Sequence, residues 1–315
     1  MARRRLHTGV CDLLGIEVPI LQAGMGSATN AGLVAAVSGA GGLGILGALR
    51  RPLRDLAAQI EQIKASGTRV FGVNHVLGQL DADALDLTLD LKVPVLSTAW
   101  GDPAAVVEMG HGRGAKVVHQ VNTVAQALRA ADAGVDVIVA QGNEGGGHVG
   151  HLSTLTLVPQ IADAVKPVPV LAAGGIGDGR GLAAAMMLGA QGVLVGTRFL
   201  ATTEAPVHPA WKRAIVAATD ENTVASKFYD AMRGEDWPGA VVRTLRNRWI
   251  DEWGDRPDEW HRVAEELRPA FLDAFRAGEF PMAGEVSGLI RAEASAADVV
   301  REMAAQAEAL LSAAQ

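Results

Sequence analysis

The chain has 315 residues, of which 49% are hydrophobic and 20% are charged, so it can bury a large core without disulfides or a structural metal. Its formal net charge of -7 argues against a nucleic-acid-binding or anionic-membrane surface, because such surfaces need clustered basic side chains. The single cysteine, Cys11, excludes an internal disulfide and a cysteine-ligated zinc site. Composition therefore predicts an enzyme of small-molecule chemistry in a reducing compartment.

The N-terminal region has neither a signal peptide nor a membrane span in our interpretation. Residues 1–5 are basic, but Asp12 and Glu17 interrupt any apolar run, which predicts a cytoplasmic location. Residues 21–49 are uncharged and long enough to cross a bilayer, yet they are rich in glycine and contain Asn30. A strand-helix-strand unit explains the same residues, so we predict no membrane partner.

Short β-branched runs alternate with helix-like segments from residue 18 onward, as in repeated βα units around a parallel sheet. Several runs are apolar on both faces, which is typical of strands covered on both sides. Eight consecutive units favour a closed barrel over an open doubly wound sheet. The predicted strands are 18–23, 42–46, 70–74, 93–97, 116–120, 136–141, 168–172 and 192–196, and the predicted helices include 52–66, 123–133 and 294–314.

The sequence pattern changes after Thr197, where several tryptophans occur among charged residues and no further strand is predicted. We therefore predict a TIM (β/α)8 barrel made of residues 1–203 and 285–315, with a helical insert, residues 204–284, over its C-terminal face. The tryptophans of the insert, Trp237, Trp249, Trp253 and Trp260, are expected to pack the insert onto the barrel; a lid over a ring system is the alternative.

Polar and glycine-rich clusters directly follow the predicted strands, which places them together on the C-terminal rim of a barrel. The last two strands end in Ala173-Gly174-Gly175 and Gly196-Thr197, where barrels commonly bind phosphate through backbone N–H groups. Gly39 to Gly44 matches the spacing of a dinucleotide fingerprint, but a helix-like stretch precedes it and a strand follows, so we do not expect a dinucleotide site there.

His148 ends a run of three glycines after the sixth strand, so we expect its imidazole on a tight loop at the rim, where it can act as a base. Glu144 and His151 could suggest a metal, but no third ligand follows at a recognisable spacing, and we predict none. Asn74 and Gln120 can each donate and accept hydrogen bonds, as the pyrimidine edge of a flavin requires.

In order and spacing, these motifs resemble those of the nitronate monooxygenase family, formerly called 2-nitropropane dioxygenases, and its relatives among FMN-dependent enoyl-acyl-carrier-protein and quinone reductases. The resemblance covers nearly the whole chain. It rests on PILQAGM, AGGLG, FGVN, QGNEGGGHVG, AAGGIGDGRG, VGTRFLAT and MAGEVSGLI.

The resemblance implies an FMN flavoprotein in which His148 is the catalytic base and nitronates are oxidised with O2 to a carbonyl compound and nitrite. It implies that FMN is bound by Ala23, Gly24, Met25, Asn74, Gln120, Gly146, Gly147, Ala173, Gly174, Gly175, Gly196 and Thr197. Gln120 stands where some relatives carry lysine, and Tyr229 is the only tyrosine, whereas the better-known nitronate enzymes have several around the substrate. A homodimer is compatible with this prediction.

Three alternatives are compatible with the same sequence. The first is an NAD(P)H-dependent reductase of an enoyl thioester or quinone with the same barrel. The second is a flavin-free phosphate-binding barrel, an isomerase or lyase, and the third is a binding protein without turnover. A reaction like that of IMP dehydrogenase is excluded, because it needs a nucleophilic cysteine at the rim and Cys11 precedes the first strand.

Overall fold

A computed structural model describes residues 6–313. Residues 1–5 and 314–315 of the predicted barrel lie outside the described residues, and so does Ala314, the last residue of the predicted C-terminal helix. Eight parallel strands form one sheet in the order β1-β9-β8-β6-β5-β4-β3-β2. Leu21 of β1 also pairs in parallel with Leu43, just before β2, which closes the sheet into a barrel. The strands are β1 Ile20–Gln22, β2 Ile45–Gly47, β3 Gly72–Val76, β4 Val95–Ala99, β5 Lys116–Val121, β6 Val137–Gln141, β8 Val170–Ala173 and β9 Val193–Val195. The predicted barrel is confirmed, and each predicted strand overlaps one of these.

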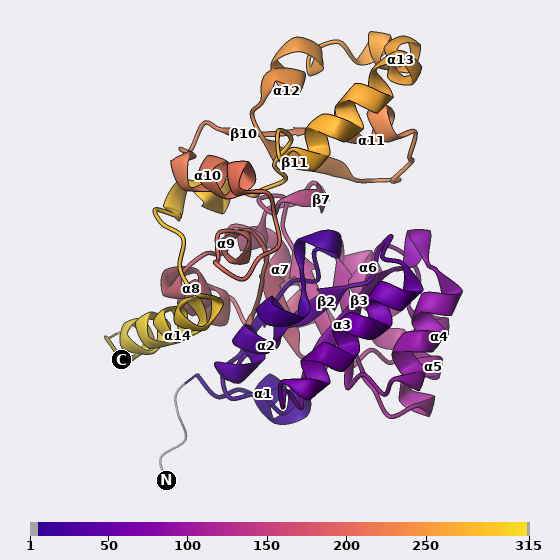
Figure 1. The fold of residues 1–315 in the computed structure, drawn as a ribbon. Helices are drawn as coiled ribbons and strands as arrows, with labels where there is room; N and C mark the ends of the chain where they lie inside the picture. The colour runs from indigo at the N-terminus through magenta and orange to yellow at the C-terminus, as the bar shows by residue number, and fades with distance from the viewer. Residues whose placement is uncertain (1–5, 314–315) are drawn as a thin grey trace.

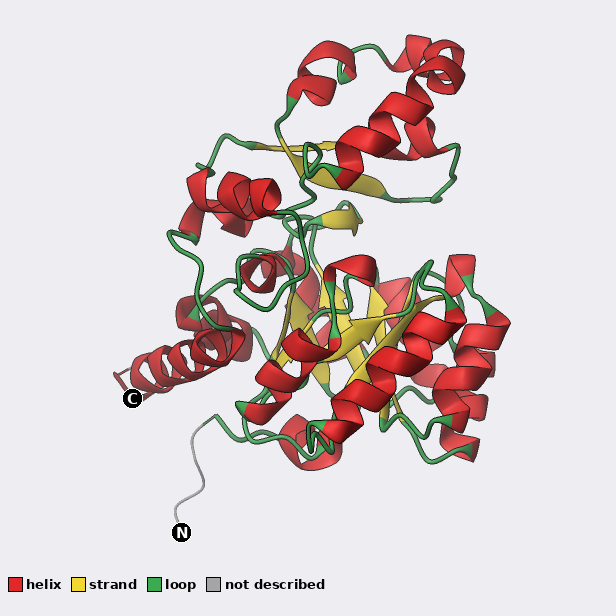
Figure 2. Cartoon of the chain, in the orientation of Figure 1, coloured by secondary structure: helices red, strands yellow, loops and turns green. Residues whose placement is uncertain are grey.

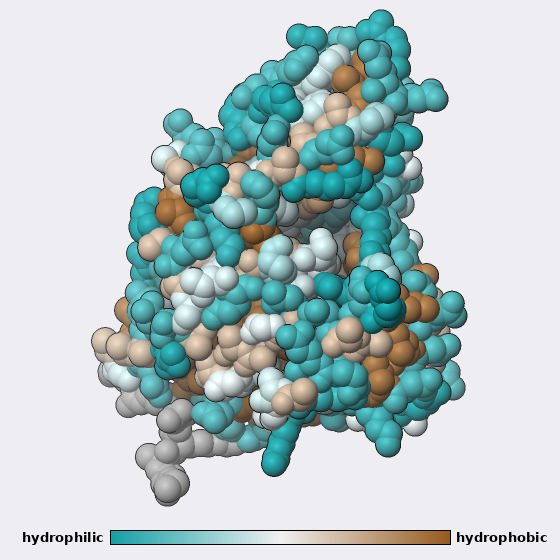
Figure 3. All heavy atoms as spheres, viewed as in Figure 1, coloured by the Kyte–Doolittle hydropathy of each residue, from teal (hydrophilic) through white to brown (hydrophobic). Residues whose placement is uncertain are grey.

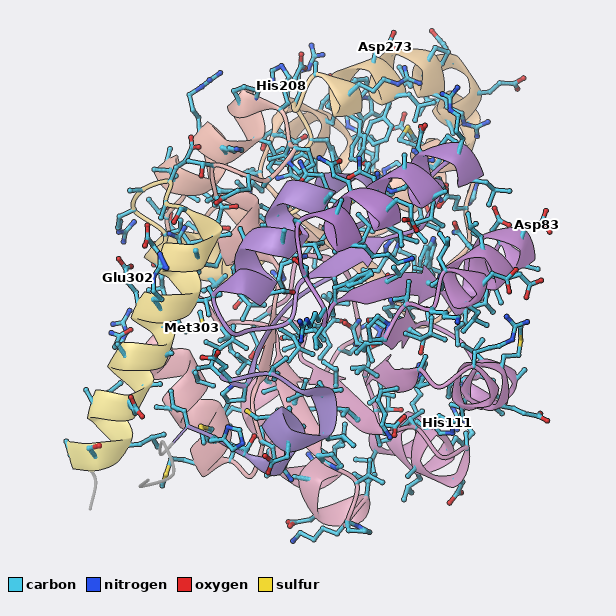
Figure 4. The ribbon with its side chains drawn as sticks, turned by 60° about the horizontal axis from the view of Figure 1, so that its bottom comes forward. Asp83, His111, His208, Asp273, Glu302 and Met303 are labelled. Carbon is cyan, nitrogen blue, oxygen red and sulfur yellow. The ribbon has the colours of Figure 1, made fainter. Side chains whose placement is uncertain are left out.

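Helices surround this barrel (Figure 2). They are α1 Gly9–Leu14, α2 Ala31–Gly39, α3 Leu53–Ala65, α4 Ala82–Asp90, α5 Ala104–Gly112, α6 Val124–Asp132, α7 Thr154–Ala164, α8 Gly179–Met187, α9 Thr197–Leu200 and α14 Ala296–Ala313, with 3-10 turns η1 Gly26–Ala28, η2 Leu77–Gln79 and η3 Glu285–Leu289. The last helix, α14, lies beside α8 (Figure 1). Gly179 allows this close approach, because an added Cβ would lie 2.5 Å from the carbonyl oxygen of Met303, a residue labelled on α14 in Figure 4.

The barrel has a packed interior that is closed at the N-terminal end of its strands. Inward-facing side chains such as Leu21, Val139 and Leu171 form a buried apolar cluster, as the alternation along strands requires. Short helix α1 contributes Cys11 and Leu14 to the same cluster and so plugs this end of the barrel. Burial raises the pKa of the Cys11 thiol, so this cysteine stays protonated and inert. The open end of the barrel is therefore the opposite one, where the strands have their carboxyl ends.

The insert contains α10 Pro209–Ala217, α11 Phe228–Arg233, α12 Arg248–Trp253 and α13 Pro257–Arg276, together with β10 Thr223–Ser226 and β11 Val241–Leu245. The prediction that no strand follows residue 197 is therefore wrong. A further strand, β7 Gly147–Val149, leaves the barrel and joins β11 and β10 in a three-stranded antiparallel sheet. The insert is predominantly helical, as predicted. Backbone hydrogen bonds between β7 and β11 connect it to the barrel.

The insert has a hydrophobic core of its own around Phe228, Phe271 and Phe280. Trp249, Trp253 and Trp260 pack in or against this core, so their role is structural within the insert. Trp237 is different, because it lines the cavity at the open end of the barrel. The division at residues 204–284 stays our proposal for the extent of the insert.

Residues 21–49 form β1, α2 and β2, as the strand-helix-strand interpretation predicts. Within residues 6–313, no helix has both the length and the apolar character needed to cross a bilayer. The glycine run Gly39 to Gly44 lies between the end of α2 and the start of β2. An added Cβ on Gly44 would lie 2.3 Å from the carbonyl oxygen of Val34, so this glycine lets α2 pack closely on the strand that follows it.

Two histidines of the barrel strands face outward into the apolar layer under the helices. His75 of β3 and His119 of β5 are each 3% exposed, and their rings hydrogen-bond to Thr88 and Thr98 at 3.0 Å and 2.8 Å. Burial removes the solvation that a charged imidazole needs and lowers the pKa of each to about 4. Both rings are therefore neutral near pH 7.

These histidines make stability depend on pH in a defined direction. Between about pH 6.5 and pH 4 the unfolded chain binds more protons, so the free energy of unfolding falls as pH falls and levels off below about 4. The expected cost is up to about 3 kcal/mol for each ring. We expect His119→Gln to flatten this decline in urea titrations at several pH values. Exposed His261→Gln is the control, and an unchanged slope in the His119 variant would contradict the assignment.

Candidate active site

A cavity of about 590 Å³ lies at the carboxyl ends of the barrel strands, below the insert. The molecular surface is hollowed where the insert meets the barrel (Figure 3). His208 of the cavity wall lies toward the insert side in Figure 4, whereas His111 lies at the opposite end of the molecule. All thirteen residues predicted for the site line this one cavity: Ala23, Gly24, Met25, Asn74, Gln120, Gly146, Gly147, His148, Ala173, Gly174, Gly175, Gly196 and Thr197.

One side of the cavity exposes backbone N–H groups after β8 and β9. Gly174 and Gly175 have φ values of +94° and +72°, a left-handed conformation that glycine adopts without strain. Within residues 6–313, their N–H groups and that of Thr197 have no protein acceptor in hydrogen-bonding position. Successive free N–H groups in such a turn form an anion-binding concavity. This part of the site therefore fits a phosphate group.

A segment near the C-terminus supports this wall. The N–H of Gly284 donates to Thr197 Oγ1 at 2.9 Å, and the N–H of Glu285 donates to the carbonyl of Glu144 at 2.9 Å. Gly146 and Gly284 are in close contact, since an added Cβ on Gly146 would lie 2.6 Å from the nitrogen of Gly284. The MAGEVSGLI motif thus serves to hold the two glycine-rich loops in place.

Two amide side chains line the cavity from strands β3 and β5, which lie on either side of β4. Asn74 donates to the carbonyl and hydroxyl of Ser97, which leaves its own carbonyl oxygen available to the cavity. Among the described residues, the side chain of Gln120 makes no hydrogen bond. Gly24 is required beside Asn74, because an added Cβ would lie 2.3 Å from the Cβ of Asn74. Both amides can therefore bind the edge of a flat heterocycle.

His148 also lines the cavity, and it is held by the insert. It lies in β7 and pairs with Val242 of β11, so the expectation that it stands on a tight loop is wrong. Its Nε2 lies 2.9 Å from Oδ1 of Asp230 in α11, and its ring stacks on Trp237 at 3.7 Å between centroids. Trp100 and Tyr229 contact the same ring edge-on. The imidazole is thus fixed in position at the cavity.

One tryptophan of the insert, Trp237, belongs to the site and not to the core of the insert. The interpretation of Trp237 as packing the insert is corrected, since Trp237 lines the cavity and stacks on the imidazole. Trp100 takes a left-handed backbone conformation, with φ of 58°, which is uncommon outside glycine and typical of functional loops. Tyr229 also lines the cavity, so the only tyrosine of the chain does reach the site.

An ion-pair cluster joins the insert to the barrel at the cavity. Glu235 accepts hydrogen bonds from Arg233 on the insert at 2.6 Å and lies 2.6 Å from Arg50 on the barrel. Gln79 and Trp237 also donate to its carboxylate at 3.3 Å. Burial alone raises the pKa of Glu235, but the hydrogen bonds and charges of the two arginines outweigh it and lower the pKa to about 2. Glu235 therefore stays charged and holds both arginines.

Replacing Glu235 by glutamine is expected to loosen the insert. Glutamine cannot balance two guanidinium groups, so amides of residues 228–245 should exchange roughly tenfold faster, equivalent to about 1.4 kcal/mol of opening free energy. Hydrogen exchange followed by mass spectrometry measures this. Glu279→Gln is the control, because its pair with Arg248 is exposed. Equal protection in both variants would show that the cluster does not hold the insert.

Glu144, a residue considered in the sequence as a metal ligand, makes its hydrogen bonds to Thr154. Both of its carboxylate oxygens accept from the N–H of Thr154 at the start of α7, and one also accepts from the Thr154 hydroxyl. Among residues 6–313, no group of three or more histidine, cysteine, aspartate or glutamate side chains is placed to hold a metal ion. Glu144 has a structural role, capping a helix.

Sequence reasoning missed Asp230, Arg50, Arg233 and Glu235. Asp230 is separated from His148 by 82 positions in the sequence. It lies in a helix whose apolar residues, Phe228 and Met232, pack in the core of the insert, so nothing in the local sequence marks Asp230 as a site residue. The left-handed Arg50 follows β2 and gives no turn signal of its own. A weak signal did exist for Trp100, which directly follows the fourth strand like the other rim residues.

The family model described as nitronate monooxygenase matches residues 7–85 and 76–306. The chain belongs to the nitronate monooxygenase family. A probable nitronate monooxygenase of Staphylococcus saprophyticus is 33% identical over 303 residues, covering 81% of this chain and 83% of the relative. A 5-hydroxy-7a-methyl-1-oxo-octahydro-1H-indene-4-carboxyl-CoA dehydrogenase of Mycobacterium tuberculosis is 41% identical over 243 residues, covering 76% and 67%.

Two solved structures extend this similarity over almost the whole chain. FabK from Thermotoga maritima superposes with a TM-score of 0.86 at 34% identity and covers 98% of each chain. A nitroalkane oxidase from Streptomyces ansochromogenes superposes with a TM-score of 0.84 at 28% identity, covering 98% of this chain and 100% of the other. This member of the family is an oxidoreductase, so the isomerase, lyase and binding-protein alternatives are set aside.

Proposed function

We propose that this enzyme binds FMN in the cavity and oxidises alkyl nitronates with O2 to a carbonyl compound and nitrite. The observation that carries the proposal is the convergence on one cavity of a turn with unpaired backbone N–H groups, the carbonyl oxygen of Asn74, the amide of Gln120 and a fixed histidine. Each feature suits one part of FMN chemistry, and together they match what the family resemblance implies. A cytoplasmic location belongs to the same proposal.

The residues that would hold FMN follow from the contacts above. The N–H groups of Gly174, Gly175 and Thr197 would bind the phosphate, because they point to no protein acceptor. Asn74 and Gln120 would bind the polar edge of the flavin ring, near Ala23, Gly24 and Met25. When bound, FMN supplies an acceptor for the electrons that leave the substrate and a route for them to O2.

His148 supplies the acid-base chemistry. A neutral nitroalkane must lose the proton on the carbon beside the nitro group before oxidation, and a neutral imidazole at the cavity wall can take it. The C–H bond breaks, the electron pair stays on the substrate, and the proton moves to the ring. Trp237 stacks on the histidine ring and Trp100 contacts it edge-on, so both side chains help to hold the imidazole in place at the cavity.

A second candidate is a CoA-thioester or enoyl-thioester substrate, with NAD(P)H as a redox partner. It is favoured by the 41% identity to the carboxyl-CoA dehydrogenase of Mycobacterium tuberculosis. The carbon beside a thioester carbonyl is also acidic, so His148 could serve the same purpose. Three arginines that line the cavity, Arg50, Arg233 and Arg276, are compatible with the phosphates of CoA or a nicotinamide nucleotide.

The visible spectrum of the purified enzyme, recorded without O2, separates these candidates. We expect bands of bound flavin that bleach when a nitronate is added and do not bleach with NADH or NADPH alone. Bleaching by NADH or NADPH alone would favour the thioester or quinone reductase. Absence of flavin bands after incubation with FMN would remove the proposed cofactor and with it the proposed function.

A further inference from the structure

We propose that Asp230 is a positioning residue that holds His148 as the tautomer protonated on Nε2, so that Nδ1 is the nitrogen that receives the substrate proton. The inference rests on the proposed function, because it assigns a role to the same histidine. It names a residue of the insert as part of the machinery of the barrel. Its basis is the environment of the two nitrogens of the ring.

The two ring nitrogens have different surroundings. Nε2 lies 2.9 Å from Oδ1 of Asp230, a side chain that is 5% exposed. A carboxylate only accepts hydrogen bonds, so the hydrogen between them belongs to Nε2. Nδ1 has no hydrogen-bond partner within residues 6–313 and is not among the fully buried polar atoms. Its lone pair is therefore open to the cavity that His148 lines.

The aromatic contacts fix the plane of the imidazole, and the hydrogen bond to Asp230 determines which of its two orientations the ring takes. Trp237 stacks on one face of the ring at an interplanar angle of 19°, and Trp100 and Tyr229 approach edge-on at 73° and 76°. These contacts fix the plane of the ring, but they do not distinguish it from a ring turned over by 180°. Only the bond to Asp230 distinguishes the two orientations, because turning the ring would place carbon where Nε2 lies.

The carboxylate of Asp230 is incompletely satisfied while the imidazole is neutral. Its second oxygen, Oδ2, is buried and has no hydrogen-bond partner among the described residues. An unsatisfied buried acceptor is costly and calls for an explanation. When the substrate C–H bond breaks and its proton joins Nδ1, the ring becomes a cation beside this buried carboxylate. The pair then stabilises the charge that the reaction creates.

Other charges near the site do not contact the imidazole in the same way. The remaining charged or titratable side chains of the cavity lining are Arg50, Glu144, His208, Tyr229, Arg233 and Arg276. Arg50 and Arg233 are held by Glu235, and Glu144 is held by Thr154. Within residues 6–313, Asp230 is the only carboxylate that hydrogen-bonds to His148.

Asp230→Asn tests the proposal, because asparagine keeps the shape and can accept from or donate to the ring. Nitrogen-15 NMR of the intact enzyme, with the His148 signals assigned by their loss in His148→Gln, reports the tautomer directly. We expect the Nε2-protonated form in the wild type and a mixed or Nδ1-protonated form in the variant. An Nδ1-protonated wild type, or a tautomer unchanged in the variant, would overturn the proposal. The wild-type spectrum decides even if the variant does not fold.

Turnover gives a second readout. In Asp230→Asn, kcat/KM for a neutral nitroalkane should fall about 100-fold, while that for the preformed nitronate should fall less than tenfold, because the nitronate has already lost its proton. Exposed Asp236→Asn is the matched control on the same insert. Equal losses with both substrates would contradict the positioning role. If neither substrate reacts with the wild type, the proposed function fails, and the NMR result still decides the tautomer.

Discussion

His148→Gln is expected to reduce the rate of reaction with a neutral nitroalkane by about 100- to 10,000-fold, the usual contribution of a general base. Glutamine keeps an N–H group that can donate to Asp230, so the buried carboxylate is not left without a partner. It cannot take a proton from carbon. The preformed nitronate needs no deprotonation, and its rate should fall less than tenfold.

Rapid-mixing measurements of flavin bleaching without O2 give both rates on one preparation. His151→Gln is the control, because His151 is exposed, lies three residues away and is not part of the cavity lining. A variant that loses both substrates equally would show that His148 serves binding or folding rather than proton transfer. A variant that loses neither would exclude the histidine from the chemistry.

The barrel could be predicted from the sequence because its strands are covered on both sides. Runs such as that ending in Ala173 are apolar throughout, and a polar or glycine cluster marks where each strand ends. The same rule brought Asn74, Gln120 and the glycines of the proposed phosphate site to one cavity, since the carboxyl ends of barrel strands meet at one face. Local pattern and fold geometry together were sufficient for this half of the site.

The other half depends on contacts between distant parts of the chain. Strand β10 is half-exposed along its length and has no apolar alternation, so no strand was predicted there. Without β11, the strand that holds His148 could not be recognised either, because β7 has only three residues and two are glycine or histidine. Asp230 and Trp237 reach the imidazole through this pairing. Non-local hydrogen bonding, rather than any local preference, places the insert half of the site.

Gly196→Ala is expected to weaken FMN binding about ten- to a hundred-fold, the loss of one or two hydrogen bonds to a charged group. Gly196 lines the cavity and precedes the free N–H of Thr197. A methyl group there would meet only Met25 Sδ at 3.4 Å and Ala23 Cβ at 3.8 Å, which are ordinary contacts. The protein should therefore fold while the added methyl group occupies space that the phosphate needs.

Gly174 and Gly175 are less suitable for this test, because their positive φ values would add backbone strain to any side chain and confuse binding with stability. Titration of the flavin-free protein with FMN, followed by quenching of flavin fluorescence, measures the affinity. Gly112→Ala is the control, since an added Cβ there meets nothing within 4 Å and the residue lies outside the cavity lining. Thermal unfolding without FMN checks that both variants keep the fold. Unchanged affinity in Gly196→Ala would place the phosphate elsewhere, whereas a selective loss would support the turn after β9 as part of the FMN site and so the cofactor on which the proposed oxidation depends.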